Sequence, residues 1–242
     1  MKETRRLKLL LVSGVLVLAS LACVISGGRE GRQTTSEVID RGSIQQAQVT
    51  LKMGAGQLSV DSGTDKLMEG EFTYQNPAEP PLIDYAAASS RKTGELVVEQ
   101  GEVARFNLGD DYYLAWDLLF TEAIPLDFSI VLGAGEGNLD LREIDLRSLK
   151  VEVGAGESQI WLGGDLEEDV PVTIRGGVGE LTVRFPAGTP VSAKVAGGIG
   201  EIKVSGLSRE GSAYVSPEYG SGPALLLDIE GGVGEVRLEV LE

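Results

Sequence analysis

The residues best suited to chemistry lie in one stretch of the chain, Phe106–Phe120, where aromatic side chains lie beside acidic ones. They are Asp110, Asp111 and Asp117, with Tyr112, Tyr113 and Trp116. Aromatic rings beside carboxylates are typical of sugar-binding sites, and a pair of carboxylates can hydrolyse a glycosidic bond. The spacing does not fix the distance between the carboxyl groups. Catalysis, ligand binding and core packing therefore stay open, and we favour packing.

A second aromatic pair, Tyr214 and Tyr219, lies in the Gly/Ser/Pro-rich stretch Leu207–Pro223. Loops inserted into repeat proteins often carry their binding function, although many are simply tolerated. We therefore name Tyr112, Tyr113, Trp116, Tyr214 and Tyr219 as a candidate partner or ligand surface.

Most other chemistry is excluded by composition. The chain has no histidine and one cysteine, Cys23, which excludes imidazole general bases, Cys/His nucleophiles and nearly all zinc sites. We expect no enzyme activity, catalytic residue, cofactor or metal. The formal net charge of −16 repels nucleic acid, so we expect no nucleic-acid partner.

A glycine pattern recurs along the chain and indicates the elements that must position these residues. Six corners read Gly-x-Gly followed by an acid or amide, beginning at Gly54, Gly133, Gly154, Gly177, Gly198 and Gly232. The flanking residues alternate between apolar and polar, which is typical of strands. A period of about 21 residues predicts an all-β, single-domain β-solenoid over residues 49–242, in which successive copies stack.

Two positions of the repeat vary together. The first three copies have Met53, Leu132 or Val153 before the corner and alanine within it, whereas the last three have glycine before it and Val178, Ile199 or Val233 within it. Because close-packed interiors conserve volume, this pattern predicts that both positions fill one corner of the core. Val178→Ala would then cost about 1–3 kcal/mol.

Five of the six corners are followed by glutamate, and stacking would place these carboxylates about 4.8 Å apart. Such a stripe could bind cations or a basic partner. A solvated face that discourages edge aggregation is the alternative, and we favour it.

The longest gap in the repeat, 57–132, predicts strands at Leu67–Gln75, Leu82–Ala88, Glu95–Gln100, Tyr112–Phe120 and Leu126–Leu132. At this period the gap could hold three less regular rungs. Residues 207–223 are predicted to be an inserted loop.

The N-terminus indicates membrane tethering. A basic start and an apolar run precede Cys23, which predicts a lipoprotein-type signal peptide over 1–22 with lipidation of Cys23, or a signal anchor to about residue 26. The polar residues 23–48 are predicted to be a flexible spacer, and the following domain is expected to be extracytoplasmic.

Several segments together resemble the toast-rack family, bacterial extracytoplasmic proteins related to the LiaF C-terminal domain and to adhesin-like β-solenoids. The resemblance rests on TLKMGAGQLSV, DKLMEGEFTY, PLDFSIVLGAGEGNLDL and LRSLKVEVGAGE. It implies a β-solenoid with envelope-stress or adhesin-like associations and brings no catalytic residues.

The leading functional hypothesis is a membrane-tethered interaction or scaffold module at the cell envelope, adhesin-like and without enzyme activity, whose protein or glycan partner is open. One alternative is an accessory regulator of the envelope-stress response, acting through a membrane partner. A third is a protein that binds or cleaves polysaccharide.

Overall fold

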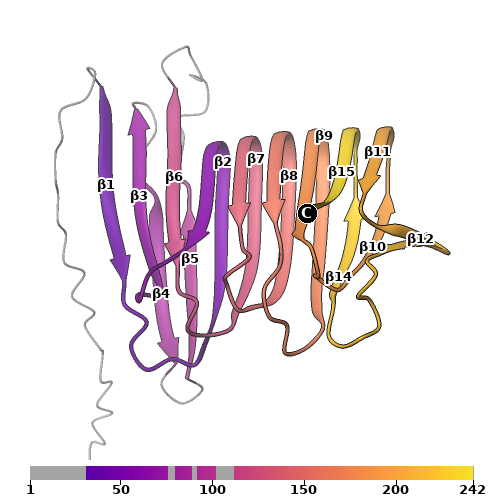
Figure 1. The fold of residues 1–242 in the computed structure, drawn as a ribbon. Coiled ribbons are helices and arrows are strands. Elements are labelled where there is room, and N and C mark those ends of the chain that lie inside the picture. The colour runs from indigo at the N-terminus through magenta and orange to yellow at the C-terminus, as the bar shows by residue number, and fades with distance from the viewer. Residues whose placement is uncertain (1–30, 76–79, 89–91, 102–111, 242) are drawn as a thin grey trace, which may run out of the picture.

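The computed structural model describes residues 31–75, 80–88, 92–101 and 112–241, and all of their helix-or-strand structure is β-strand (Figure 1). Within these ranges no helix is both long and apolar enough to cross a bilayer. The strands are β1 Arg32–Ile39, β2 Gln46–Ser62, β3 Met68–Gln75, β4 Leu82–Ala88, β5 Thr93–Glu99, β6 Tyr113–Phe120, β7 Leu126–Asp140, β8 Leu146–Trp161, β9 Val170–Pro186, β10 Val191–Ala196, β11 Ile199–Ser205, β12 Ser208–Glu210, β13 Ala213–Val215, β14 Leu225–Glu230 and β15 Val233–Leu241.

The four longest strands, β2, β7, β8 and β9, each contain a Gly-x-Gly corner and fold over at it, as the arches of Figure 1 show. The second glycine of each corner has a positive φ, such as +129° at Gly156, a conformation that residues with a Cβ resist. A Cβ added at Gly156 would also lie 1.9 Å from the carbonyl oxygen of Gly135 in the neighbouring arch. Both constraints explain why the corner requires glycine.

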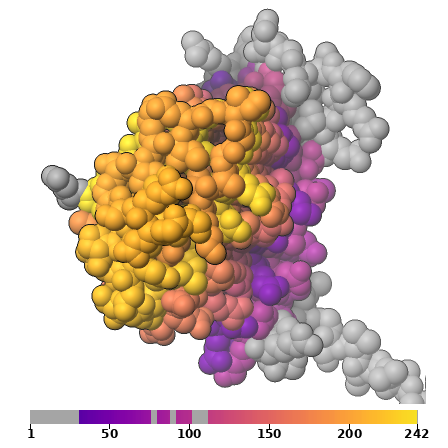
Figure 2. Space-filling view, turned by 90° about the vertical axis from the view of Figure 1, so that its right-hand side faces the viewer, coloured from indigo at the N-terminus to yellow at the C-terminus, as the bar shows by residue number. Residues whose placement is uncertain are grey.

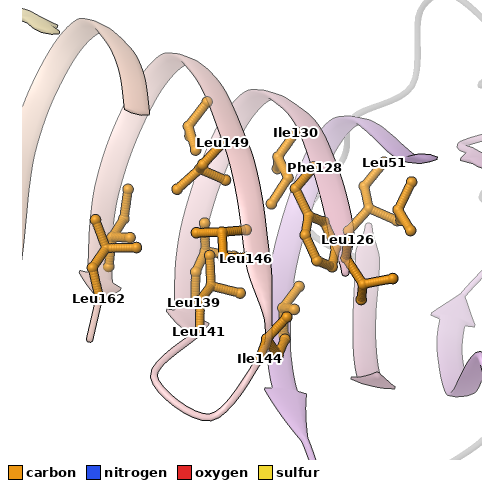
Figure 3. Close-up of a cluster of buried hydrophobic side chains, with 14 of the residues drawn as sticks. Leu51, Leu126, Phe128, Ile130, Leu139, Leu141, Ile144, Leu146, Leu149 and Leu162 are labelled. Atoms are coloured by element: carbon orange, nitrogen blue, oxygen red, sulfur yellow. The ribbon is translucent and has the colours of Figure 1, made fainter. Parts of the chain in front are cut away.

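The arches stack in parallel and in register. Gly56 pairs with Gly135, Gly135 with Gly156, and Gly156 with Gly179. Each arch therefore contributes one strand to each of two facing layers, and the apolar side chains of both layers point inward (Figure 3). Leu51, Ile130 and Val151, which are successive register partners, are 1% exposed or less. The predicted β-solenoid with one continuous core is confirmed.

The order of the last two rungs differs from the prediction. The rung made by β14 and β15 lies between β9 and the rung made by β10 and β11, because β15 pairs with both β9 and β11 while β14 pairs with both β9 and β10. The expectation that successive copies stack in sequence order is therefore wrong at this end. The last rung of the chain is internal, and the rung before it ends the stack.

Residues 207–223 provide the connection that this order requires. After β11 the chain forms the short antiparallel pair β12 and β13, and β13 pairs with the outer edge of β10. The chain then continues to β14, one rung back toward β9. The predicted inserted loop is thus a partly β-structured return crossing.

The N-terminal part contains the predicted strands but not three rungs. β5 and β6 pair in parallel with the two halves of β2, and β4 and β3 pair antiparallel with β5 and β6. One interrupted rung therefore follows β2, and antiparallel strands border it.

The predicted spacer is shorter than expected. β1 pairs antiparallel with β3 along its whole length, from Arg32 opposite Gln75 to Ile39 opposite Met68. The β-branched residues Thr34, Thr35, Val38 and Ile39 favour a strand, and the polar Ser36 and Glu37 between them suit the edge of a sheet. Residues 23–30, the remainder of that prediction, lie outside the described residues.

Candidate interaction surface

The column of glycine corners is closed at its N-terminal end by two side chains. The side-chain oxygen of Gln100 accepts hydrogen bonds from the backbone N–H groups of Gly54 and Ala55, at 2.6 and 3.1 Å. The Tyr112 hydroxyl donates to the carbonyl oxygen of Ala55 at 2.7 Å and accepts from Nε2 of Gln100 at 3.0 Å. Burial raises the pKa of the Tyr112 phenol, which keeps this donor protonated. Side chains thus replace a further rung here.

An open hollow of about 340 Å³ lies beside this closed end, lined in part by Tyr112, Tyr113 and Glu136. The guanidinium of Arg32 covers the Tyr113 ring, with its carbon 3.6 Å from the ring centroid. Tyr112 and Tyr113 therefore lie together, and their predicted role in ligand binding stays a prediction.

The structure does not bring the other predicted surface residues to this hollow. Trp116 is 1% exposed and packs edge to face on Phe72, with ring centroids 5.7 Å apart. The prediction that Trp116 belongs to a binding surface was therefore wrong, because its side chain on β6 points toward the core. Tyr214 lies in β13 near Arg209, and Tyr219 is 43% exposed in the return crossing, at the far end of the stack.

Of the three predicted aspartates, only Asp117 lies in the described part of the chain. Asp117 is exposed on β6, opposite Ser59 of β2 and Glu71 of β3. Asp110 and Asp111 lie outside the described residues, as does Cys23, whose lipidation stays a prediction.

An apolar ridge runs along the outer tip of the corners. Its members are register partners: Ala55, Ala134, Ala155, Val178, Val233 and Ile199. The three large ones are exposed, Val178 at 58%, Val233 at 48% and Ile199 at 77%. The prediction that they fill the core corner is therefore wrong. They point outward because the bend at the corner interrupts the two-residue alternation of the strand.

In four of the rungs volume is instead balanced across the corner, between the residue before it and the residue five positions later. Leu132 faces Gly137, and Val153 is matched with the small Ser158. In the later rungs the sizes are reversed: a Cβ on Gly231 would lie 2.7 Å from Val236, and one on Gly197 would lie 3.0 Å from Ile202. In the rungs of β7 and β8 the large residue therefore precedes the corner, and in the last two rungs of the stack it follows the corner.

The predicted glutamate ladder is present. Gln57, Glu136, Glu157, Glu180, Glu235 and Glu201 are successive register partners. Lys203 bonds Glu235 at 2.7 Å and Glu201 at 3.4 Å, and Arg237 also contacts Glu235. These two cations lower the pKa of the Glu235 carboxyl, Lys203 more strongly. Among the described residues no cluster of three or more acids is placed to hold a metal ion, and a cation role stays a prediction.

Among the described residues, no side chain caps the other end of the stack in a comparable way. We call residues 198–205, the corner Gly198–Gly200 together with β11, the open end. β11 pairs with β15 on one side and with no other described strand, whereas the outer edge of β10 is covered by β13. Ile199 and Ile202 are exposed there at 77% and 38%. Figure 2 shows this end of the molecule face on.

A narrow groove follows the corners toward the open end, lined by Gly176, Gly197, Gly231 and Val236 among others. Its cavity volume is about 30 Å³, which is room for one or two water molecules and far less than a drug-sized ligand needs. This groove is therefore too small to hold a drug-sized ligand.

Sequence reasoning did not find the open end. The available signal was the 34-residue spacing between Gly198 and Gly232, which is longer than a rung requires. That excess corresponds to the return crossing that places the last rung inside the stack.

Comparison with a family model identifies the N-terminal domain of toast_rack, DUF2154, over residues 28–184. No curated protein sequence matches the chain.

Among solved structures, a candidate cell adhesion protein from Clostridium sporogenes ATCC 15579 is similar with a TM-score of 0.82 and 29% identity, covering 87% of this chain and 100% of that one. A candidate adhesin from Bacteroides fragilis NCTC 9343 matches with a TM-score of 0.31 and 14% identity, over 87% of this chain and 98% of its own.

Proposed function

This chain belongs to the toast-rack family, and from that premise we propose that it is a membrane-tethered, non-enzymatic interaction module at the bacterial cell envelope, adhesin-like in role. One observation carries the proposal: the similarity to the Clostridium sporogenes cell adhesion candidate extends over that entire chain. The N-terminal basic and apolar run before Cys23 supports the tether and an extracytoplasmic location.

The surface supports binding through broad faces. The described part of the solenoid presents an apolar ridge with three large exposed side chains beside a ladder of carboxylates. Exposed apolar groups bordered by polar ones are typical of protein-binding surfaces. The roles in envelope-stress regulation and in polysaccharide binding or cleavage stay predictions.

Tethering is tested by fractionating bacteria that express the full chain and by measuring the intact mass of the membrane-extracted protein. We expect loss of residues 1–22 and gain of lipid on Cys23. The Cys23→Ser variant distinguishes the two tethers by intact mass. In a lipoprotein it should abolish both the loss of residues 1–22 and the lipid, whereas a signal-anchored protein should keep its full length with and without the substitution. Wild-type protein found wholly in the soluble fraction would contradict tethering.

Binding is tested with beads that carry the purified chain, presented to envelope preparations and whole cells. We expect retention above that of beads carrying an unrelated acidic protein of similar net charge. Retention equal to that control would contradict an adhesin-like role.

A further inference from the structure

Each corner in the stack is shaped to receive the next one. A Cβ on Gly154 would lie 2.2 Å from the carbonyl oxygen of Gly133, and one on Gly177 would lie 1.9 Å from that of Gly154. The same relation holds for Gly198 and the carbonyl oxygen of Gly232, at 2.1 Å. A carbonyl of each rung therefore rests against a glycine of the rung that follows. At the open end, the carbonyl groups of Gly198 and Gly200 are the ones left for a further rung.

This relation restricts what can dock in parallel on the open end. The second glycines obey it too, since a Cβ on Gly200 would lie 1.6 Å from the carbonyl oxygen of Gly234. An added segment must therefore have glycine at both corner positions. Beyond the corner the added segment needs an apolar residue at every second position, because these would lie beside Ile202 and Val204 of β11, which face the core side of the layer.

The chain itself shows that a rung can dock without being next in sequence. β15 pairs in parallel with β9 from Val233 opposite Val178 to Leu241 opposite Pro186, although β10 to β14 lie between them in the chain. β11 then pairs with the other edge of β15. Docking therefore depends on the corner and the register and not on a short connection. An arch supplied by another protein could therefore dock in the same way if it had the glycine corner and the register.

We propose that the open end binds an extended segment of a partner protein that carries a Gly-x-Gly corner followed by alternating apolar residues, by parallel strand addition to β11. Main-chain hydrogen bonds supply affinity in this mode, and the side-chain positions supply selectivity. A branched residue between the two glycines would extend the ridge beyond Ile199. The segment would need no strand before its corner, since β13 already covers β10.

A second copy of this chain does not fit. Its N-terminal corner is occupied by Gln100 and Tyr112, so it cannot stack head to tail on the open end. Two β11 edges could pair antiparallel only if the neighbouring layers also met. β13 and β12 extend that layer beyond β10, so in such a dimer they would lie between the two copies.

The test uses a synthetic peptide of residues 177–186, GVGELTVRFP, which is the corner and second half of β9. In register, its Arg184 position would lie beside Ser205, because both positions align with Glu239 of β15. Neighbouring strands are about 4.8 Å apart, within the range of Cα separations that a disulfide can bridge. The full chain carrying Cys23→Ser and Ser205→Cys is mixed, in detergent, with peptides carrying cysteine at position 184 or 182 under mild oxidation.

We expect the position-184 peptide to crosslink at least about tenfold more than the position-182 peptide. A Gly179→Val change in the position-184 peptide should remove the crosslink, because its side chain would meet the carbonyl of Gly200. An Ile202→Lys protein, with its circular dichroism spectrum checked for folding, should also lose it. No crosslink, equal crosslinking at both positions, or insensitivity to Gly179→Val would each overturn the proposal.

This inference rests on the proposed binding role, which it deepens by naming the surface and the chemistry of the partner. The two fail separately. If envelope binding is retained while the peptide does not crosslink in register, the interaction role stands and another surface carries it. If the peptide crosslinks but envelope retention is absent, strand addition stands without an adhesin-like role.

Discussion

The two ends of the corner column satisfy the same backbone geometry in different ways. At the N-terminal end, Gln100 and Tyr112 bond the backbone of Gly54 and Ala55. At the other end, none of the described side chains caps Gly198–Gly200 and β11 in this way. The ridge there has its largest and most exposed member, Ile199. A solenoid must close its ends to avoid association. A chain that closes one end with dedicated side chains and leaves the other as a bare edge has one end suited to binding.

The largest loss of stability should come from substitution of the corner glycines, because the stacking of the rungs between both ends depends on them. Gly179→Ala places a Cβ 1.9 Å from the carbonyl oxygen of Gly156 at a φ of +139°. It should lower the free energy of unfolding by at least about 3 kcal/mol. Gly176→Ala is the matched control three residues earlier. Its Cβ would meet nothing closer than 3.9 Å, and it should be neutral or stabilise by about 0.4–1 kcal/mol. Urea unfolding measures both, and equal losses would contradict the stacking geometry.

The exchange of large and small residues between the two halves of the stack can be reversed in one rung. Val153→Gly and Ser158→Leu should each cost about 1–3 kcal/mol, the first by leaving a cavity and the second by overpacking. The double variant adopts the pattern of the rungs with Gly197 and Gly231, in which glycine before the corner leaves room for a large residue five positions later, so its loss should be clearly smaller than the sum. A double-mutant cycle on unfolding free energies measures this coupling, and additive losses would argue against it.

The closed end should depend on its cap. Gln100→Ala removes the acceptor of two backbone N–H groups and should cost about 1–2 kcal/mol, and Tyr112→Phe about 1 kcal/mol. Gln57→Ala is the control, because this glutamine makes a single exposed bond to Glu136 and should change stability by less than about 0.5 kcal/mol. Thermal or urea unfolding decides the point. Equal effects at Gln100 and Gln57 would mean that this end is not capped as described.

The smallest effect is expected on the ridge. Val178→Ala and Ile199→Ala should each cost less than about 0.5 kcal/mol, because both side chains are more than half exposed. The corner prediction made from sequence requires 1–3 kcal/mol at Val178, so one unfolding experiment separates the two descriptions.

The sequence was sufficient for the strands, the glycine corners and the inward-facing residues, because strand alternation and corner glycines are local properties. It was misleading at Val178, since alternation with period two does not continue through a bend with positive φ. The inward face is regained only at Leu181, five residues after Gly176.

The order of rungs could not be predicted. The corners at Gly177, Gly198 and Gly232 carry the same pattern of a preceding glycine and a branched central residue. Each of these corners can therefore pack against either of the others. No local feature of the sequence distinguishes rungs stacked in chain order from a last rung inserted between two earlier ones. The candidate surface shares this difficulty, because an open edge depends on which strand is last in space.

The most direct test of the account is the position of β15 between β9 and β11. Thr182, Arg237 and Lys203 are successive outward-facing register partners on these strands. In a Cys23→Ser background, cysteine pairs at 182 and 237, and at 203 and 237, should form disulfides readily. A pair at 182 and 203 should not, because β15 separates those strands. An efficient disulfide between 182 and 203, with none at 203 and 237, would contradict the inserted rung and the open end that depends on it.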